Sequence, residues 1–138
     1  MIKMIKMYHN PVLLEESIIG LNINPNGIYV DATFGGGGHS TEILNKLNSS
    51  GRIIAFDQDQ DAIDNKILDK RVSLVKSNFK YLNNYLNYFK INKIDGLLAD
   101  FGISSHQIDN EKRGFSTRFD SDLDMRMNNL QKTDAKAV

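Results

Sequence analysis

The fold is decided by one stretch of the sequence, Ile28-Tyr-Val-Asp-Ala-Thr-Phe-Gly-Gly-Gly-Gly-His-Ser40. Its first part, Ile28–Thr33, is a short apolar run typical of a buried strand, and four glycines follow at once. A helical pattern then runs from about His39 to Leu47, with its apolar side chains on one face. A strand, a glycine turn and a helix in this order predict the first unit of a parallel sheet with crossover helices.

The same alternation continues on both sides of this unit. Further strands are predicted at Arg52–Asp57, Val72–Val75 and Ile94–Asp100, and further helices at Asp61–Lys70 and Leu82–Phe89. An opening helix is predicted from Pro11, with Asn10 as its cap and an apolar stripe at Leu14, Ile18 and Leu21. The strands are continuous apolar runs, as in sheets that are covered on both faces. We therefore expect a Rossmann-like α/β fold.

Composition narrows the class of protein. The chain has 138 residues, with 17 basic and 17 acidic side chains and no cysteine. The zero formal charge argues against a histone-like nucleic-acid binder, and the lack of cysteine excludes disulfides and thiol catalysis. No stretch approaches the roughly 18 apolar residues of a membrane span, and Met1–Met7 lacks the apolar core of a secretory signal. These features predict a cytoplasmic protein.

The regular pattern stops after the fourth predicted strand. Residues 101–131 are rich in charged side chains and show no helical or strand periodicity, and Thr133–Val138 resembles a capped helix that has barely begun. We therefore expect two parts. Residues 1–100 form the N-terminal half of a domain, and residues 101–138 form a loop-rich active-site segment with the start of a truncated helix. The fold is expected to be incomplete at its C-terminus.

The glycine run and the second strand predict a ligand site. In open parallel sheets, ligands bind outside the carboxyl ends of the strands, which is where Gly35–Gly38 and Asp57 fall. Asp57 follows Gly37 by 20 residues, the spacing that places a carboxylate on a ribose diol. A dinucleotide site prefers a third glycine where Ser40 stands, so a nicotinamide-dependent oxidoreductase is a disfavoured rival. Asp31, four residues before Gly35, points instead to S-adenosylmethionine, whose ammonium group a carboxylate can bind.

Other candidate residues leave alternatives open. His39 either acts through its side chain or marks the start of a helix that presents backbone N–H groups. Asp100 either faces the same crevice or caps the loop at Ser104 or Ser105, and Phe79 either covers an adenine ring or belongs to the core. Two aspartate ladders, which begin at Asp57 and Asp120, lack the glycine and glutamate of a calcium loop, so no metal is expected.

Several longer motifs carry a resemblance to a known family. They are Tyr8-His-Asn-Pro-Val-Leu-Leu14, Gly27-Ile-Tyr-Val-Asp31, Thr33-Phe-Gly-Gly-Gly-Gly-His-Ser40, Ala55-Phe-Asp-Gln-Asp59, Asp95-Gly-Leu-Leu-Ala-Asp-Phe-Gly-Ile-Ser-Ser105, Gln107-Ile-Asp109, Arg113-Gly-Phe-Ser116 and Leu123-Asp-Met-Arg-Met127. From about Tyr8 to the last residue, the chain resembles the ribosomal small-subunit methyltransferase H family, which methylates the exocyclic N(4) amine of a cytosine in 16S rRNA. It departs from the family where His106 replaces the usual proline, and family members are longer.

The resemblance implies a set of contacts with S-adenosylmethionine, namely Gly37, Gly38, His39, Asp57, Phe79, Asp100 and Gln107. It also implies 16S rRNA in the small ribosomal subunit as the partner, and it assigns no catalytic base. Arg113, Arg118 and Arg126, with Phe115 and Phe119, either contact RNA or pin the segment through internal Arg–Asp pairs. A non-catalytic cofactor-binding fragment is the alternative, and we expect this chain alone to bind cofactor weakly and to turn over little.

Overall fold

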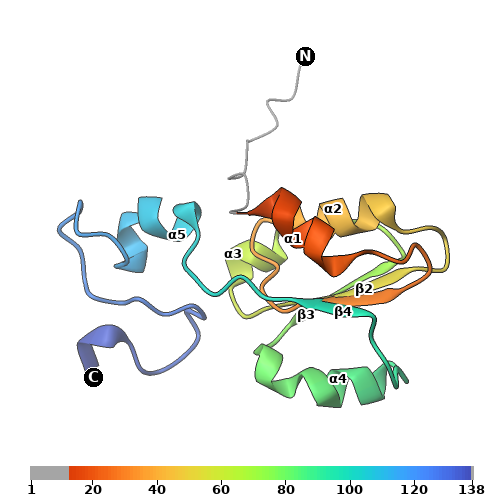
Figure 1. Cartoon of the computed structure of the whole chain (residues 1–138). Coiled ribbons are helices and arrows are strands. Elements are labelled where there is room, and N and C mark those ends of the chain that lie inside the picture. The colour runs from red at the N-terminus through yellow and green to blue at the C-terminus, as the bar shows by residue number, and fades with distance from the viewer. Residues whose placement is uncertain (1–12, 138) are drawn as a thin grey trace.

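The computed structural model describes residues 13–137, apart from the side chain of Ser105. Four parallel strands form one sheet in the order β3-β2-β1-β4 (Figure 1). Their bounds are β1 Ile28–Asp31, β2 Arg52–Asp57, β3 Val72–Lys76 and β4 Gly96–Leu98. The predicted Rossmann-like winding is confirmed. The first and fourth strands are shorter than predicted, and Asp100 lies beyond the end of β4.

Helices cover both faces of the sheet. Their bounds are α1 Leu14–Leu21, α2 Gly38–Lys46, α3 Gln60–Ile63 and α4 Leu82–Tyr88, the last preceded by a 3-10 turn at Phe79–Tyr81. The first two helices lie over one face and α4 lies over the other (Figure 1). Asn10 and Pro11, the predicted start of the first helix, lie outside the described residues.

The alternation of side chains along the strands produces two hydrophobic clusters. Tyr29 and Ile53 point toward α1 and α2, where Ile18 and Ile43 complete the first cluster. Val30 and Phe56 point to the opposite face and pack against α4, whose Tyr85 meets the Phe56 ring edge-on at 5.6 Å. Since every central strand is buried on both sides, its sequence is a continuous apolar run.

The prediction of a long third helix is wrong. Helix α3 ends at Ile63 instead of Lys70, and Leu68 is 88% exposed. The side-chain amide of Asn65 donates to the carbonyl of Asp61 at 2.9 Å. A continuing helix would bond that carbonyl to the backbone N–H of residue 65, so the asparagine side chain ends the helix.

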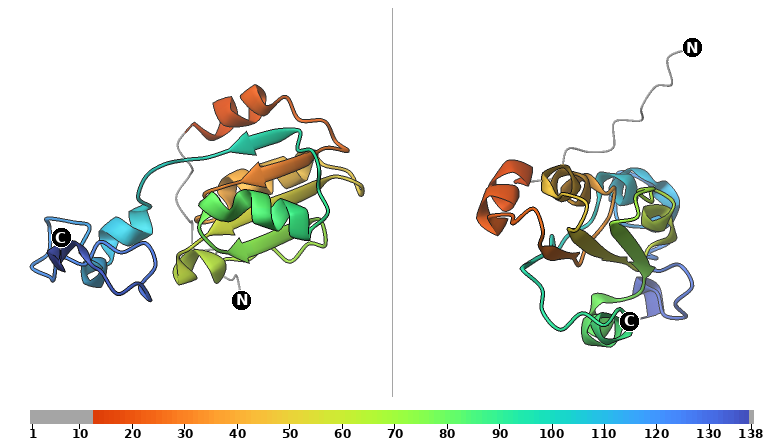
Figure 2. Two further views of the ribbon diagram at one scale, coloured as in Figure 1. Left: turned by 90° about the horizontal axis from the view of Figure 1, so that it is seen from below. Right: turned by 90° about the vertical axis from the view of Figure 1, so that its right-hand side faces the viewer.

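The segment after β4, residues 101–137, is called here the C-terminal arm. Besides loops, the arm contains helix α5, Ser105–Asp109, which the sequence pattern did not predict, and 3-10 turns at Glu111–Arg113 and Ala135–Ala137. Ser104 and Gln107 form a capping box that starts α5. The arm extends from one end of the sheet (Figure 2). Among residues 13–137, no helix is long and apolar enough to cross a membrane.

Candidate functional site

A cavity of about 720 Å³ lies at the carboxyl ends of the strands. Its walls come from the loops after all four strands and from the C-terminal arm. The first three strands are added in one direction from β1, whereas β4 is added on the other side of β1. Loops diverge at such a reversal, and ligands of open α/β sheets bind there. A cavity therefore lies at the position where the sequence predicted a ligand site.

The glycine loop shapes one wall of this cavity. Gly37 caps α2 with a φ of 78°, and a Cβ at this position would lie 2.9 Å from the ring of Phe34. The close approach and the left-handed backbone both require glycine. Gly37 itself does not line the cavity, but Gly38 and His39 in the first turn of α2 do.

Asp57 ends β2 and projects into the cavity. Its Oδ2 accepts the N–H of Gly35 at 2.8 Å, and its Oδ1 accepts the N–H of Asp59 at 2.9 Å. Burial raises the pKa of this carboxyl, and the two backbone N–H donors oppose the rise. The two bonds fix the orientation of the carboxylate between the ends of the first two strands.

His39 is the most unusual polar group at the site. Its side chain is 6% exposed, and its Nε2 has no hydrogen-bond partner among the described residues. Native proteins rarely leave a buried polar atom unpaired. His39 also lines the cavity, but its Nε2 is buried from solvent in this structure.

Two of the predicted residues, Phe79 and Asp100, lie around the opening together with Phe101, which was not predicted. Phe79 follows β3, and Phe101 follows Asp100 beyond β4. The two rings lie 5.6 Å apart, although their strands are the two edges of the sheet. Phe79 is exposed and lines the cavity, so it is not a core residue. The N–H of Asp100 donates to the Thr33 hydroxyl at 2.7 Å, which joins the loops after β4 and β1.

Asp31 does not take the position proposed for it at the ammonium group of a ligand. It is fully buried, does not line the cavity, and accepts the Ser40 hydroxyl at 2.6 Å and the Thr33 N–H at 3.1 Å. Desolvation by burial raises its pKa. The hydrogen bond between Ser40 and Asp31 also gives the serine a structural role. The serine that departs from the dinucleotide pattern ties α2 to β1.

Gln107 lies in the cavity wall with its amide turned to protein partners. Its Oε1 accepts the N–H of Ser104 at 3.0 Å, and its Nε2 donates to Asp59 Oδ2 at 2.8 Å. Asp59 caps α3, and its carboxylate also pairs with Arg113 at 2.7 Å. Sequence reasoning missed this pairing, since nothing local links residues 54 positions apart.

The other arginines of the arm are paired internally, as one of the two alternatives predicted. Arg126 bonds Asp124 at 2.6 Å, and Arg118 bonds Asp109. Their guanidinium groups hold turns of the arm in place. Among the described residues, no group of three His, Cys, Asp or Glu side chains is placed to hold a metal ion.

The sheet order, the glycine turn and the cavity define a Rossmann-like α/β protein with a ligand site at the strand ends. A sequence profile of the MraW methylase family matches residues 6–138, and the chain belongs to that family.

Two relatives are each named ribosomal RNA small subunit methyltransferase H. The protein from Christiangramia forsetii is 59% identical over 131 residues, which cover 95% of this chain and 43% of the relative. The protein from Flavobacterium johnsoniae is 55% identical over 130 residues, which cover 94% of this chain and 42% of the relative. The chain thus spans less than half the length of these curated relatives.

A solved structure supports the fold. It is the crystal structure of a protein from Clostridium thermocellum assigned as an rRNA methylase, and it matches with a TM-score of 0.54 at 20% identity. The match covers 72% of this chain and 58% of that protein.

Proposed function

We propose that this chain supplies the cofactor-binding part of an S-adenosylmethionine-dependent methyltransferase. Its acceptor is the exocyclic N(4) amine of a cytosine in 16S rRNA of the small ribosomal subunit. The observation that carries the proposal is the cavity at the strand ends, in which Asp57, His39 and Phe79 converge. Family membership and the names of the relatives support the reaction and the acceptor.

The residues around the cavity fit S-adenosylmethionine. Each Asp57 oxygen already accepts one backbone N–H and retains a lone pair for a ribose hydroxyl. The exposed face of Phe79 suits an adenine ring. The N-terminus of α2 suits the carboxylate of the methionine part, and His39 belongs to the same wall of the cavity. When bound, this cofactor supplies an electrophilic methyl group.

The protein's own contribution is to position the two reactants. The lone pair of the cytosine amine is delocalised into its ring, so transfer depends on holding nitrogen and methyl carbon about 3–3.5 Å apart and in line. The hydrogen bond between Asp100 and Thr33 links the loops after β4 and β1, and so fixes the cavity wall beyond β4. An acceptor base reaches such a wall only when it is unstacked, which single-stranded rRNA allows at lower cost than a duplex.

Thermal unfolding with ligands tests the proposal. We expect S-adenosylhomocysteine at about 100 times its dissociation constant to stabilise the chain by about 2.7 kcal/mol, a shift of a few degrees for a domain of this size. A nicotinamide dinucleotide is expected to cause no shift, because Ser40 fills the position of the third glycine. A shift with the dinucleotide alone would overturn the proposal in favour of an oxidoreductase.

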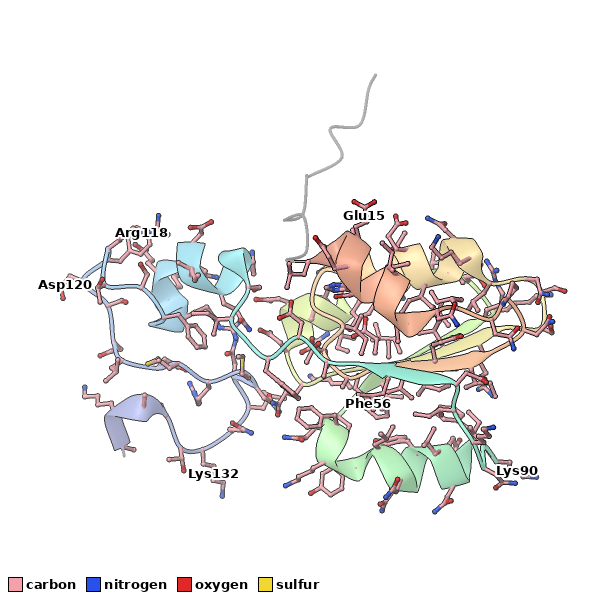
Figure 3. All side chains as sticks on the ribbon, viewed as in Figure 1. Glu15, Phe56, Lys90, Arg118, Asp120 and Lys132 are labelled. Carbon is pink, nitrogen blue, oxygen red and sulfur yellow. The ribbon has the colours of Figure 1, made fainter. Side chains whose placement is uncertain are left out.

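A matched pair of variants locates the binding. Asp57→Asn removes the charge at the strand end and is expected to reduce the shift, whereas Asp120→Asn changes an exposed carboxylate at the far end of the arm (Figure 3). Equal shifts in both variants would place the ligand elsewhere. Methyl transfer to small-subunit RNA by the chain then separates a catalytic protein from a cofactor-binding fragment.

A further inference from the structure

One buried ion pair joins the C-terminal arm to the sheet domain. Arg113, at the end of the second 3-10 turn, is 4% exposed and reaches α3. Its Nη2 donates to Asp59 Oδ2 at 2.7 Å, and its Nη1 donates to Asp59 Oδ1 at 3.2 Å and to Asp61 Oδ2 at 3.0 Å. A guanidinium fork that bonds both oxygens of one carboxylate fixes angle as well as distance.

The same guanidinium also holds a second part of the arm. Nη2 donates to the backbone carbonyls of Arg126 at 2.9 Å and Met127 at 3.3 Å. The amide of Gln107 adds bonds to Asp59 at 2.8 Å and to the Met127 sulfur at 3.2 Å. Arg113 therefore lies at the junction of α3, α5 and the loop that carries Met127.

The position of this junction relates it to the cavity. Asp59 and Asp61 line the cavity from the sheet domain, and Gln107 and Met127 line it from the arm. Arg113 itself is absent from the lining. Its bonds thus join the two walls of the cavity, although Arg113 itself lies outside the cavity and would not contact a bound ligand.

We propose that Arg113 is a positioning residue whose ion pair with Asp59 and Asp61 latches the arm onto α3 and closes the cofactor cavity. The proposal rests on the proposed function for the identity of the ligand, but the latch itself does not depend on it. Opening the latch separates the cavity walls and lets the ligand leave. A group that acts on closure changes the dissociation rate of a ligand more than its association rate.

Hydrogen exchange of the full chain tests the latch without any ligand. In Arg113→Gln we expect the amides of α5 to exchange about ten-fold faster or more, because local opening no longer breaks the ion pair. Amides of β2 report global unfolding and are expected to change less. Lys132→Gln is the control, since Lys132 is an exposed cation of the arm and has no ion pair among the described residues (Figure 3).

A second variant guards against misfolding. Arg113→Gln leaves the buried Asp59 carboxylate without its cationic partner, which destabilises proteins strongly. Asp59→Asn with Arg113→Gln removes both charges and keeps a side chain that caps α3. In both variants, we expect the exchange rates of the α5 amides to increase by a larger factor than those of the β2 amides. Unchanged α5 exchange in both, or an equal rise in α5 and β2 in both, would overturn the latch.

The dissociation rate of S-adenosylhomocysteine tests the link to the cavity. We expect it to rise by about ten-fold or more in both Arg113 variants and to stay unchanged in Lys132→Gln. Unchanged dissociation in the Arg113 variants would overturn the role in closure. If the unmodified chain binds no S-adenosylhomocysteine, the proposed function fails, while the exchange measurements still decide whether the latch exists.

Discussion

The hydrogen bond between Asp31 and Ser40 gives a serine beside the cavity a structural role. The carboxylate is fully buried behind the glycine turn, and the serine hydroxyl, 2.6 Å away, supplies the donor that a buried carboxylate requires. A glycine at position 40, as in dinucleotide sites, would leave one oxygen of Asp31 without that donor. The serine is therefore a structural partner and also the residue that separates this turn from the dinucleotide pattern.

Ser40→Ala is expected to destabilise the chain by about 1–3 kcal/mol at neutral pH, because a buried acceptor loses its partner. Burial raises the pKa of Asp31, and the Ser40 hydroxyl opposes that rise, so the variant raises it further. A carboxyl with a raised folded-state pKa binds protons more tightly when folded, so stability falls as pH rises from about 3.9 through the folded pKa. The deficit of the variant should accordingly be largest at neutral pH.

Urea unfolding of the unmodified chain and of Ser40→Ala between pH 4 and pH 8 measures this dependence. The deficit is expected to shrink as pH falls through the raised folded-state pKa of Asp31, because protonation removes the charge that the Ser40 hydroxyl stabilises. Ser49→Ala, at an exposed position, is the control and should show no pH-dependent difference. A deficit that is constant across the range would contradict the assignment of the effect to Asp31.

At the scale of elements, the C-terminal arm depends on a tight crossing of two segments at Gly114. Its φ is 68°, and a Cβ there would lie 2.4 Å from the carbonyl oxygen of Asp122 and 2.6 Å from the nitrogen of Asp124. The Met125 N–H bonds the Arg113 carbonyl at 2.9 Å beside this crossing. The crossing thus connects the turn that carries Arg113 to the loop that Arg113 binds.

Gly114→Ala is expected to loosen the arm, since the left-handed backbone alone costs about 1–2 kcal/mol and the new methyl group meets rigid backbone. Limited proteolysis should cut the variant within the arm faster than the unmodified chain. Gly102→Ala is the matched control, because no atom lies within 4 Å of a Cβ there and its φ is not positive. Equal cutting rates in the two variants would show that the crossing is not tight in solution.

Elements built from local patterns were predictable from the sequence, and elements ended or joined by particular side chains were not. Strand β2 has the predicted bounds, because an apolar run bounded by Gly51 and an aspartate leaves little choice. Helix α3 is shorter than predicted, because Asn65 takes a backbone carbonyl. Helix α5 was missed, although the Ser104–Gln107 capping box is a readable local signal.

In the site, too, features set by local patterns were predictable and contacts between distant residues were not. The glycine turn and Asp57 were placed by their spacing, and the structure brings them to one cavity with His39, Phe79 and Asp100. The bonds between Arg113 and Asp59 join residues 54 positions apart, and no periodicity encodes such a contact. The division at residue 100, the cofactor contacts and the cytoplasmic location stay predictions.

At the scale of the whole molecule, the hydrophobic core and the cavity have different extents. The buried hydrophobic side chains of the described residues all belong to the range 18–98, in the sheet and the helices that cover it. The arm contributes buried polar groups, Gln107 and Arg113, and part of the cavity wall. Stability therefore resides in the first part of the chain, whereas closure of the cavity requires both parts.

A chain that ends at residue 100 is accordingly expected to keep a cooperative thermal transition. Its truncation exposes Asp59 to water, so the carboxylate loses Arg113 without remaining buried, unlike in Arg113→Gln. The cavity would lose the wall formed by Ser104, His106, Gln107 and Met127. Affinity for S-adenosylhomocysteine should then fall by about ten-fold or more, since a ligand with less buried surface dissociates faster.

Calorimetric unfolding and titration with S-adenosylhomocysteine test this prediction on the full and the shortened chain. The unfolding reports on the hydrophobic core, and the titration reports on the ligand cavity. A cooperative transition with weakened binding is the expected result. Loss of the transition would show that the arm belongs to the folding unit, because the two hydrophobic clusters would then be insufficient to hold the sheet. Undiminished binding would show that the strand-end loops form the whole ligand site, and that the arm closes over it without adding contacts that retain the ligand.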